Sequence, residues 1–203
     1  RKKTVTISNP INIKEIYRKS TESEVNMNYD IVFLGRLSEP KNPLKFIELM
    51  RMVVDEFPSL KVAMIGDGIL KNSCENKIIE LNLSNNISLL GFLNNPYGIL
   101  ASAKILCMTS LWEGFGLAAV EALSLGIPVI ATPVGGLPNI VNGECGLLAV
   151  NDSEYVKEII KLLTNKEYWG KKSKNAYKHS LELNNIDNYV NSLAAIYERC
   201  IKK

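Results

Sequence analysis

Short β-rich runs alternate with helical patterns along the chain, and this alternation restricts the fold more than any other feature of the sequence. The expected strands are short and apolar on both faces, as in a sheet that is buried on both sides. They are residues 4–8, 30–35, 60–66, 87–91, 105–109 and 128–132. Helical spacing of apolar residues predicts helices over residues 43–57, 69–83, 97–103, 117–125, 153–163 and 187–201.

This order of elements predicts an α/β fold, a doubly wound, Rossmann-like domain with a mostly parallel sheet. We expect residues 1–203 to form this single domain. Residues 166–203 would be a polar connection followed by the C-terminal helix, because residues 166–186 are rich in lysine and asparagine and have no clear period. Ligands of such sheets bind outside the carboxyl ends of the strands, so the loops there are where functional residues are expected.

Composition excludes several classes of protein. A hydrophobic fraction of 46% and a charged fraction of 22% are those of a globular chain, not of a disordered or fibrous one. The net charge of +3 is too small to predict a nucleic-acid partner. Four widely spaced cysteines and one histidine do not fit a zinc site, and we interpret the cysteines as reduced thiols of a cytosolic protein. The sequence starts at Arg1 without a methionine, which suggests a piece of a longer protein.

The loop after the second expected strand carries two cations. It contains Gly35, Arg36 and Lys41 and leads into the helix predicted to start at Pro43. A glycine allows close approach of the backbone to a ligand, and a helix N-terminus attracts anions. An arginine fork and a lysine beside it would suit a diphosphate. The alternative is a solvated loop with ordinary surface charges.

The next strand ends in Gly66-Asp67-Gly68, which resembles the start of a dinucleotide-binding fingerprint. The third glycine of that G-x-G-x-x-G pattern would fall at Lys71, so a Rossmann dehydrogenase is not expected. The sequence also lacks the G-x-x-x-x-G-K-[ST] loop of P-loop kinases and ATPases. A purely structural turn explains this glycine pair nearly as well as contact with a ligand.

Two glutamates stand out in the most apolar region. Glu121 is the only charged residue between Gly114 and Gly143, and it falls inside a predicted apolar helix, where an ionised carboxylate needs a partner. Glu113 precedes that helix in a glycine-rich loop, so both carboxylates are expected to line one cleft. The alternative places Glu121 on an exposed helix face or against backbone N–H groups. Gly135-Gly136 forms a further turn that could bring backbone N–H groups to the same cleft.

Together these motifs resemble the retaining glycosyltransferases of family four. The resemblance rests on Gly35-Arg36-Leu37 with Lys41, on Gly66-Asp67-Gly68, and on Glu113 and Glu121 with seven residues between them. It implies the GT-B fold, in which two Rossmann-like domains face each other across a cleft. This chain is similar only to the C-terminal, nucleotide-sugar-binding domain, over about residues 1–165 and, we expect, to its end.

The resemblance also implies roles for individual residues. Arg36 and Lys41 would hold the donor diphosphate and stabilise the charge on the leaving group, Glu113 would contact the donor sugar, and Glu121 would accept hydrogen bonds from the ribose. With Glu113, Arg36 and Lys41 as the catalytic residues, the remaining donor-binding positions would be Gly35, Gly66, Phe92 and Leu93 near the base, Gly114, Phe115, Gly116, Leu117 and Glu121.

The same resemblance implies the partners. The donor would be a UDP- or GDP-sugar, no metal or other cofactor would be needed, and a hexosyl unit would pass to a glycan or lipid-linked acceptor held by the N-terminal domain, which this chain lacks. The chain alone is therefore expected to bind the donor weakly and to transfer nothing. The reduced cysteines indicate a cytoplasmic location, with peripheral contact at the inner face of the membrane as an option. Lys171, Lys172, Lys174 and Lys178 would form a solvated face or contact an anionic membrane.

Two alternatives stay open at this point. The first is a nucleotide-sugar 2-epimerase-like half, which shares the fold. The second is a non-catalytic nucleotide-binding or regulatory module. The Gly35-Arg36-Leu37 loop together with the Glu113-Gly114-Phe115-Gly116 loop favours the transferase over the epimerase.

Overall fold

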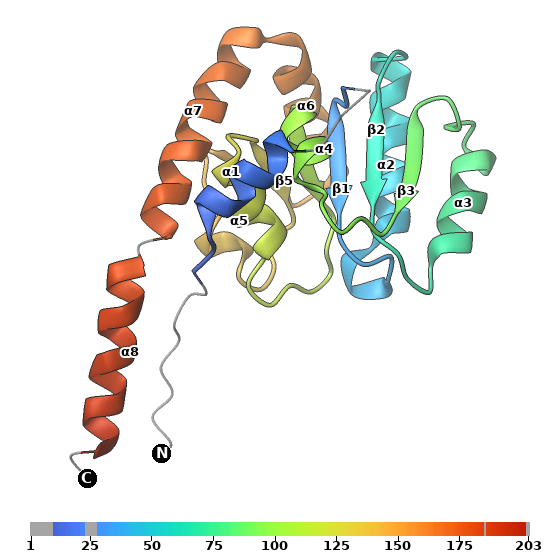
Figure 1. Ribbon diagram of the computed structural model, residues 1–203. Helices are drawn as coiled ribbons and strands as arrows, with labels where there is room; N and C mark the ends of the chain where they lie inside the picture. Colours follow the sequence, from blue (N-terminus) through green and yellow to red (C-terminus); the bar gives the residue numbers. More distant parts are fainter. Residues whose placement is uncertain (1–9, 23–27, 185, 202–203) are drawn as a thin grey trace.

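One parallel sheet forms the frame of the fold in the computed structural model, which describes residues 10–22, 28–184 and 186–201 (Figure 1). Its six strands lie in the order β3-β2-β1-β4-β5-β6. They are β1 (Ile31–Leu34), β2 (Val62–Ile65), β3 (Ile87–Gly91), β4 (Ile105–Met108), β5 (Val129–Ala131) and β6 (Gly146–Leu148). The strand expected over residues 4–8 lies outside the described residues.

The strand order contains one reversal of direction. From β1 the chain continues outward through β2 and β3 and then crosses back to build β4, β5 and β6 on the other side. The neighbours β1 and β4, paired in parallel with Ile31 opposite Ile105, therefore mark the topological switch point. The crevice outside the carboxyl ends of the strands at such a point is the usual ligand site of an open α/β sheet.

Helices cover both faces of the sheet (Figure 1). On one face lie α2 (Pro43–Glu56), α3 (Lys71–Glu80) and α6 (Asp152–Thr164). On the other lie α4 (Tyr97–Ser102) and α5 (Leu117–Ser124), against which α1 (Ile13–Thr21) packs. The chain then forms α7 (Lys166–Leu183), which packs on α5 and α6, and α8 (Ile186–Ile201), which extends beyond α7. Short 3-10 turns span Glu39–Lys41 and Leu137–Asn139. None of the helices in these described ranges is both long and apolar enough to cross a bilayer.

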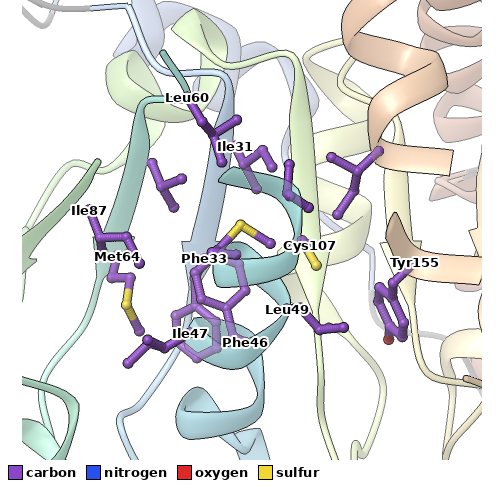
Figure 2. Packing of buried hydrophobic residues seen from close by; sticks show 14 of the residues in the cluster. Ile31, Phe33, Phe46, Ile47, Leu49, Leu60, Met64, Ile87, Cys107 and Tyr155 are labelled. Atoms are coloured by element: carbon purple, nitrogen blue, oxygen red, sulfur yellow. The ribbon is translucent and has the colours of Figure 1, made fainter. Parts of the chain in front are cut away.

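Alternating strand residues supply the two halves of the core. Ile31 and Phe33 point into the cluster beneath α2, whereas Val32 between them belongs to the cluster on the opposite face. Figure 2 shows the first cluster, where the ring of Phe33 lies 5.2 Å from that of Phe46 in α2. Burial of the strands on both faces explains why their sequences are continuously apolar instead of alternating. A sheet fixed in this way is a rigid base for the loops at its carboxyl edge.

Five of the expected strands and all six expected helices are present in the described ranges, with ends shifted by a few residues. Neither α1 nor β6, which has only three residues, was expected from the sequence. The prediction of a polar connection over residues 166–186 was wrong, because α7 occupies most of that segment. Its buried positions are Lys172, Ala176 and Ser180, which are spaced four apart but include no large apolar residue, so hydrophobic periodicity could not reveal the helix.

The lysine cluster of α7 divides into one buried and three exposed residues. Lys172 is only 7% exposed, and its Nζ donates to the carbonyl oxygens of Gly143 at 2.6 Å and Gly146 at 3.0 Å. Lys171, Lys174 and Lys178 are exposed. The prediction that all four lysines form one surface cluster is therefore wrong for Lys172, whose hydrogen bonds join α7 to the start of β6 and the loop before it. The surface cluster consists of the other three lysines.

Candidate functional site

A cavity of about 570 Å3 opens at the carboxyl edge of the sheet, beside the switch point. The loops after β1, β2 and β3 form most of its wall, and α4 and α5 close it. Its lining residues are Leu34, Gly35, Arg36, Ile65, Gly66, Asp67, Phe92, Leu93, Pro96, Tyr97 and Glu121. Six of the predicted site residues are thereby brought together, namely Gly35, Arg36, Gly66, Phe92, Leu93 and Glu121.

Arg36 provides the positive charge of the cavity. Its side chain is exposed, and within the described part of the chain it has no hydrogen bond or ion pair. A guanidinium carries five N–H donors in a planar fork, which matches the oxygens of a phosphate or carboxylate. The donors of Arg36 are therefore available to an anion that enters the cavity.

Gly66 explains how two loops can meet at the cavity wall. Its φ is +143°, a conformation that side chains with a Cβ rarely adopt, and a Cβ added there would lie 1.9 Å from the carbonyl oxygen of Gly35. Hydrogen bonds join the loops on either side, from Gly35 N to Ile65 O at 3.0 Å and from Leu37 N to Asp67 O at 2.9 Å. Gly66 is therefore required by the close approach of the two loops, whether or not it contacts a ligand. The same close approach holds Arg36 at the cavity wall.

Glu121 provides the acidic group on the opposite element. It lies in α5, and Tyr97 at the start of α4 donates its phenolic O–H to Glu121 Oε1 at 3.0 Å. Burial raises the pKa of the Glu121 carboxyl, while the hydrogen bond from Tyr97 acts in the opposite direction. Burial and the neighbouring carboxylate raise the pKa of Tyr97 to about 12. Sequence reasoning missed Tyr97, and no signal in the sequence distinguishes this tyrosine from the other seven.

Glu113 lies beside the cavity without lining it. The side chain is buried, forms an ion pair with Lys41 and accepts a hydrogen bond from Ser110 Oγ at 3.3 Å. The aliphatic part of Lys41 in turn packs against Gly35, where an added Cβ would lie 3.7 Å from Lys41 Cγ. The two predicted carboxylates thus do not line the same cavity, because the ion pair with Lys41 turns the Glu113 side chain to the neighbouring loop.

Gly135 supports the backbone of Glu113 from behind. Its φ is +55°, and a Cβ added there would lie 1.6 Å from the Glu113 carbonyl oxygen. A Cβ on Gly136 would similarly lie 2.7 Å from the Gly114 carbonyl oxygen. The Gly135-Gly136 turn therefore packs its backbone against the glutamate loop, a role different from the expected donation of N–H groups.

Other predicted positions lie outside the cavity wall. Gly114, Phe115 and Gly116 lead from Glu113 into α5, which begins at Leu117, and none of the four lines the cavity. Their proposed contact with the donor stays a prediction. The expected helix N-terminus is also displaced, since the turn Glu39–Lys41 separates Arg36 from the start of α2 and the first residues of α2 do not line the cavity.

Comparison with known proteins places the chain among enzymes of sugar transfer. A family model described as glycosyl transferases group 1 matches residues 14–179. An uncharacterized glycosyltransferase of Methanocaldococcus jannaschii is 36% identical over 138 residues, which are 64% of this chain and 34% of that protein. The UDP-Gal:alpha-D-GlcNAc-diphosphoundecaprenol alpha-1,3-galactosyltransferase of Escherichia coli is 29% identical over 84% of this chain and 45% of its own length.

A third relative comes from Campylobacter jejuni. This N-acetylgalactosamine-N,N'-diacetylbacillosaminyl-diphospho-undecaprenol 4-alpha-N-acetylgalactosaminyltransferase is 32% identical over 75% of this chain and 42% of its own length. The chain therefore spans less than half of each of these three curated relatives.

Solved structures share the fold at lower sequence identity. TarM of S. aureus, in a complex that contains UDP, superposes with a TM-score of 0.83 and 24% identity over 95% of this chain and 39% of its own. Anabaena HepE in complex with UDP gives a TM-score of 0.81 and 22% identity over 95% of this chain and 57% of its own. The C-terminal domain of a glycosyl transferase group 1 family protein from Francisella tularensis gives 0.69 and 22% identity, over 87% of this chain and 94% of that domain. These likenesses concern the fold.

Proposed function

This chain belongs to the glycosyl transferases group 1 family, and we propose that it is the half of a retaining glycosyltransferase that binds the nucleotide-sugar donor. A UDP-sugar is the first choice of donor, because one relative is named for UDP-Gal and two solved structures of the same fold hold UDP. A GDP-sugar is the second choice. Relatives that are named glycosyltransferases favour this proposal over an epimerase or a non-catalytic module.

The observation that carries the proposal is that Arg36 and Glu121, from different elements, line one cavity at the switch point. Asp67 also lines it and accepts from the backbone N–H of Gly68. Arg36 presents a guanidinium without a partner among the described residues, and Glu121 presents a largely buried carboxylate from a different element. A nucleoside diphosphate satisfies both groups, since its phosphate oxygens accept hydrogen bonds from arginine and its ribose hydroxyls donate to a carboxylate. Phe92, which is exposed on the same wall, offers a ring for the base.

The positions of Lys41 and Glu113 fit a role at the sugar end of the donor. Breaking the anomeric C–O bond places negative charge on the diphosphate, and fixed cations stabilise that charge. Lys41 uses one of its three N–H donors for Glu113, which leaves two for phosphate oxygens while Glu113 holds the ammonium in place. We propose that the second oxygen of Glu113 accepts hydrogen bonds from sugar hydroxyls. Retention follows from attack on the face that the leaving group departs from, and we assign no nucleophile to the protein and no metal to the reaction.

The acceptor belongs to the whole protein. We propose that a second domain, corresponding to the part of the relatives that this chain does not span, holds a glycan or lipid-linked acceptor for a hexosyl unit in polysaccharide biosynthesis, on the cytoplasmic side of a membrane. Exposed Lys171, Lys174 and Lys178 would allow peripheral contact with anionic lipids. The chain alone is expected to bind the donor and to transfer no sugar.

Calorimetric titration of this chain with UDP, UMP and uridine tests the donor site. We expect affinity to rise with each phosphate, and Arg36→Ala to weaken UDP binding about tenfold while changing uridine binding little, because a charge-assisted contact to phosphate is lost. Arg51→Ala is the matched control, since Arg51 pairs with Asp55 on α2 and is not part of the cavity wall. Equal affinities for UDP and uridine, or equal losses in both arginine variants, would contradict the proposal.

A further inference from the structure

Among the residues that the structure describes, the phenol of Tyr97 is the one polar contact of the Glu121 side chain. We propose that Tyr97 is a positioning residue of the donor site, which fixes the Glu121 carboxylate so that its second oxygen receives the ribose hydroxyls. The inference rests on the proposed function, because it assigns Tyr97 to the site through Glu121. Both side chains line the cavity, and Tyr97 Oη donates to Glu121 Oε1 at 3.0 Å.

The surroundings of Glu121 leave its carboxylate dependent on this single bond. The rest of α5 is apolar or small, and among the described residues no lysine, arginine or histidine pairs with Glu121. An ionised carboxylate can only accept hydrogen bonds, and it has two oxygens to do so. Tyr97 takes up one lone pair of Oε1, whereas Oε2 accepts from no described residue, so Oε2 is the more available acceptor for a ligand in the cavity.

Tyr97 is itself held by the elements around it. Its backbone N–H donates to Asn95 Oδ1 at 3.2 Å, and Asn95 Nδ2 donates to the carbonyl oxygen of Lys19 in α1 at 2.9 Å. The ring packs against the hydrophobic cluster between the sheet and α5. In Figure 1, α1 lies beside α4, in agreement with the contacts between the two helices. The Tyr97 side chain is therefore held in one position before a ligand binds. Binding then does not have to pay the entropy of ordering this side chain.

A hydrogen bond of this kind also keeps the acid in its binding form. Burial alone raises the pKa of Glu121, and a protonated carboxyl accepts hydrogen bonds less well than a carboxylate. The Tyr97 O–H stabilises the ionised form and so opposes the effect of burial. Positioning and ionisation thus both favour the ribose contact.

The test compares two ligands and three variants by calorimetry on this chain. The ligands are UDP and 2′,3′-dideoxy-UDP, which lacks the hydroxyls that Glu121 would bind. We expect Tyr97→Phe to weaken UDP binding about 5-fold, the effect of one hydrogen bond, and dideoxy-UDP binding less than 2-fold. Glu121→Ala, which removes both acceptor oxygens, should abolish the preference for UDP, and Tyr97→Phe added to Glu121→Ala should have no further effect on it.

Tyr168→Phe is the matched control. Tyr168 donates to Glu158 Oε1 at 2.8 Å, a tyrosine–glutamate hydrogen bond between α6 and α7 that lies outside the cavity wall, although Glu158 also pairs with Lys172 at 3.7 Å. This variant should leave both affinities unchanged, and a thermal melt of each variant confirms folding. In the full-length enzyme, Tyr97→Phe should raise KM for the donor with kcat unchanged, because the ribose lies away from the bond that breaks.

The possible results distinguish a failure of the proposed donor site from a failure of the positioning role of Tyr97. If the unaltered chain does not distinguish UDP from dideoxy-UDP, or if Glu121→Ala keeps the preference, the assignment of Glu121 to the ribose fails and the inference fails with it. If Glu121→Ala abolishes the preference while Tyr97→Phe retains it in full, the donor site stands and the positioning role of Tyr97 is overturned. An equal loss for both ligands in Tyr97→Phe also overturns it, since that indicates general damage to the cavity.

Discussion

Gly66→Ala is predicted to disrupt the loop that carries Arg36. The methyl group would lie 1.9 Å from the carbonyl oxygen of Gly35, whereas real Cβ atoms essentially never approach closer than 3.0 Å. The two backbones must therefore separate by about 1.1 Å, the difference between these two distances. No flexible side chain can absorb the movement, because the atom that is struck belongs to the backbone.

The expected cost has two parts. A residue with a Cβ at a φ of +143° costs about 1–3 kcal/mol. Separation of the loops strains the hydrogen bond from Leu37 N to Asp67 O, now 2.9 Å long, which adds about 1 kcal/mol. We expect the free energy of unfolding to fall by about 2–4 kcal/mol. A displacement of about 1 Å at a positioned group also lowers function steeply, so UDP affinity should fall about tenfold or more.

Urea unfolding and UDP calorimetry measure the two effects, with two other glycines as controls. Gly91 has a φ of +71° but open space where a Cβ would be, so Gly91→Ala isolates backbone strain and should cost about 1–2 kcal/mol. Gly143 has open space and no φ in the left-handed region, so Gly143→Ala should be close to neutral. Gly66→Ala and Gly91→Ala should have different free energies of unfolding if the methyl group at Gly66 pushes the Gly35 loop away. Equal values, together with an unchanged UDP affinity of Gly66→Ala, would show that this displacement does not occur.

Three further predictions concern buried charges. Burial raises the pKa of the Glu121 carboxyl, so the folded chain binds this proton more readily than the unfolded chain does. The free energy of unfolding therefore falls as the pH rises from the ordinary pKa of a glutamate to the raised pKa. Glu121→Gln should unfold at a higher temperature than the unaltered chain at pH 7, and the difference should vanish in acid. Lys41→Met leaves buried Glu113 without its cation and should lower the free energy of unfolding by about 2–3 kcal/mol in urea, most of which Glu113→Gln should restore. Lys172→Ala leaves two carbonyl oxygens without a donor and should cost about 2 kcal/mol by the same measurement, whereas Lys174→Ala on the exposed face should stay within about 0.5 kcal/mol.

The central part of the fold could be predicted because its signals are strong and local. A strand buried on both faces, such as Ile31–Leu34, is apolar throughout, and α2 combines a proline in its first turn with a regular apolar face. The helix α7 escaped prediction because its buried positions carry no large apolar residue, and one of them, Lys172, is satisfied by carbonyl oxygens that lie far away in the sequence. Tertiary contacts of that kind leave no period in the sequence.

The candidate site divides in the same way. Arg36 and Glu121 could be predicted because one follows a strand end and the other is a charge in an apolar helix, and both positions lead to the same edge of the sheet. The position of Glu113 outside the cavity wall could not be predicted, because it depends on the ion pair with Lys41. Tyr97 was missed for a related reason. Its link to the site is a hydrogen bond to Glu121, 24 positions away in the sequence.

A crystal structure of this chain with UDP would show whether the cavity is the donor site. We expect density for the nucleotide between the β1 loop and α5, with the diphosphate within hydrogen-bond distance of the Arg36 guanidinium and a ribose hydroxyl within hydrogen-bond distance of Glu121. UDP bound elsewhere on the chain, or in this cavity with its ribose turned away from Glu121, would contradict this expectation.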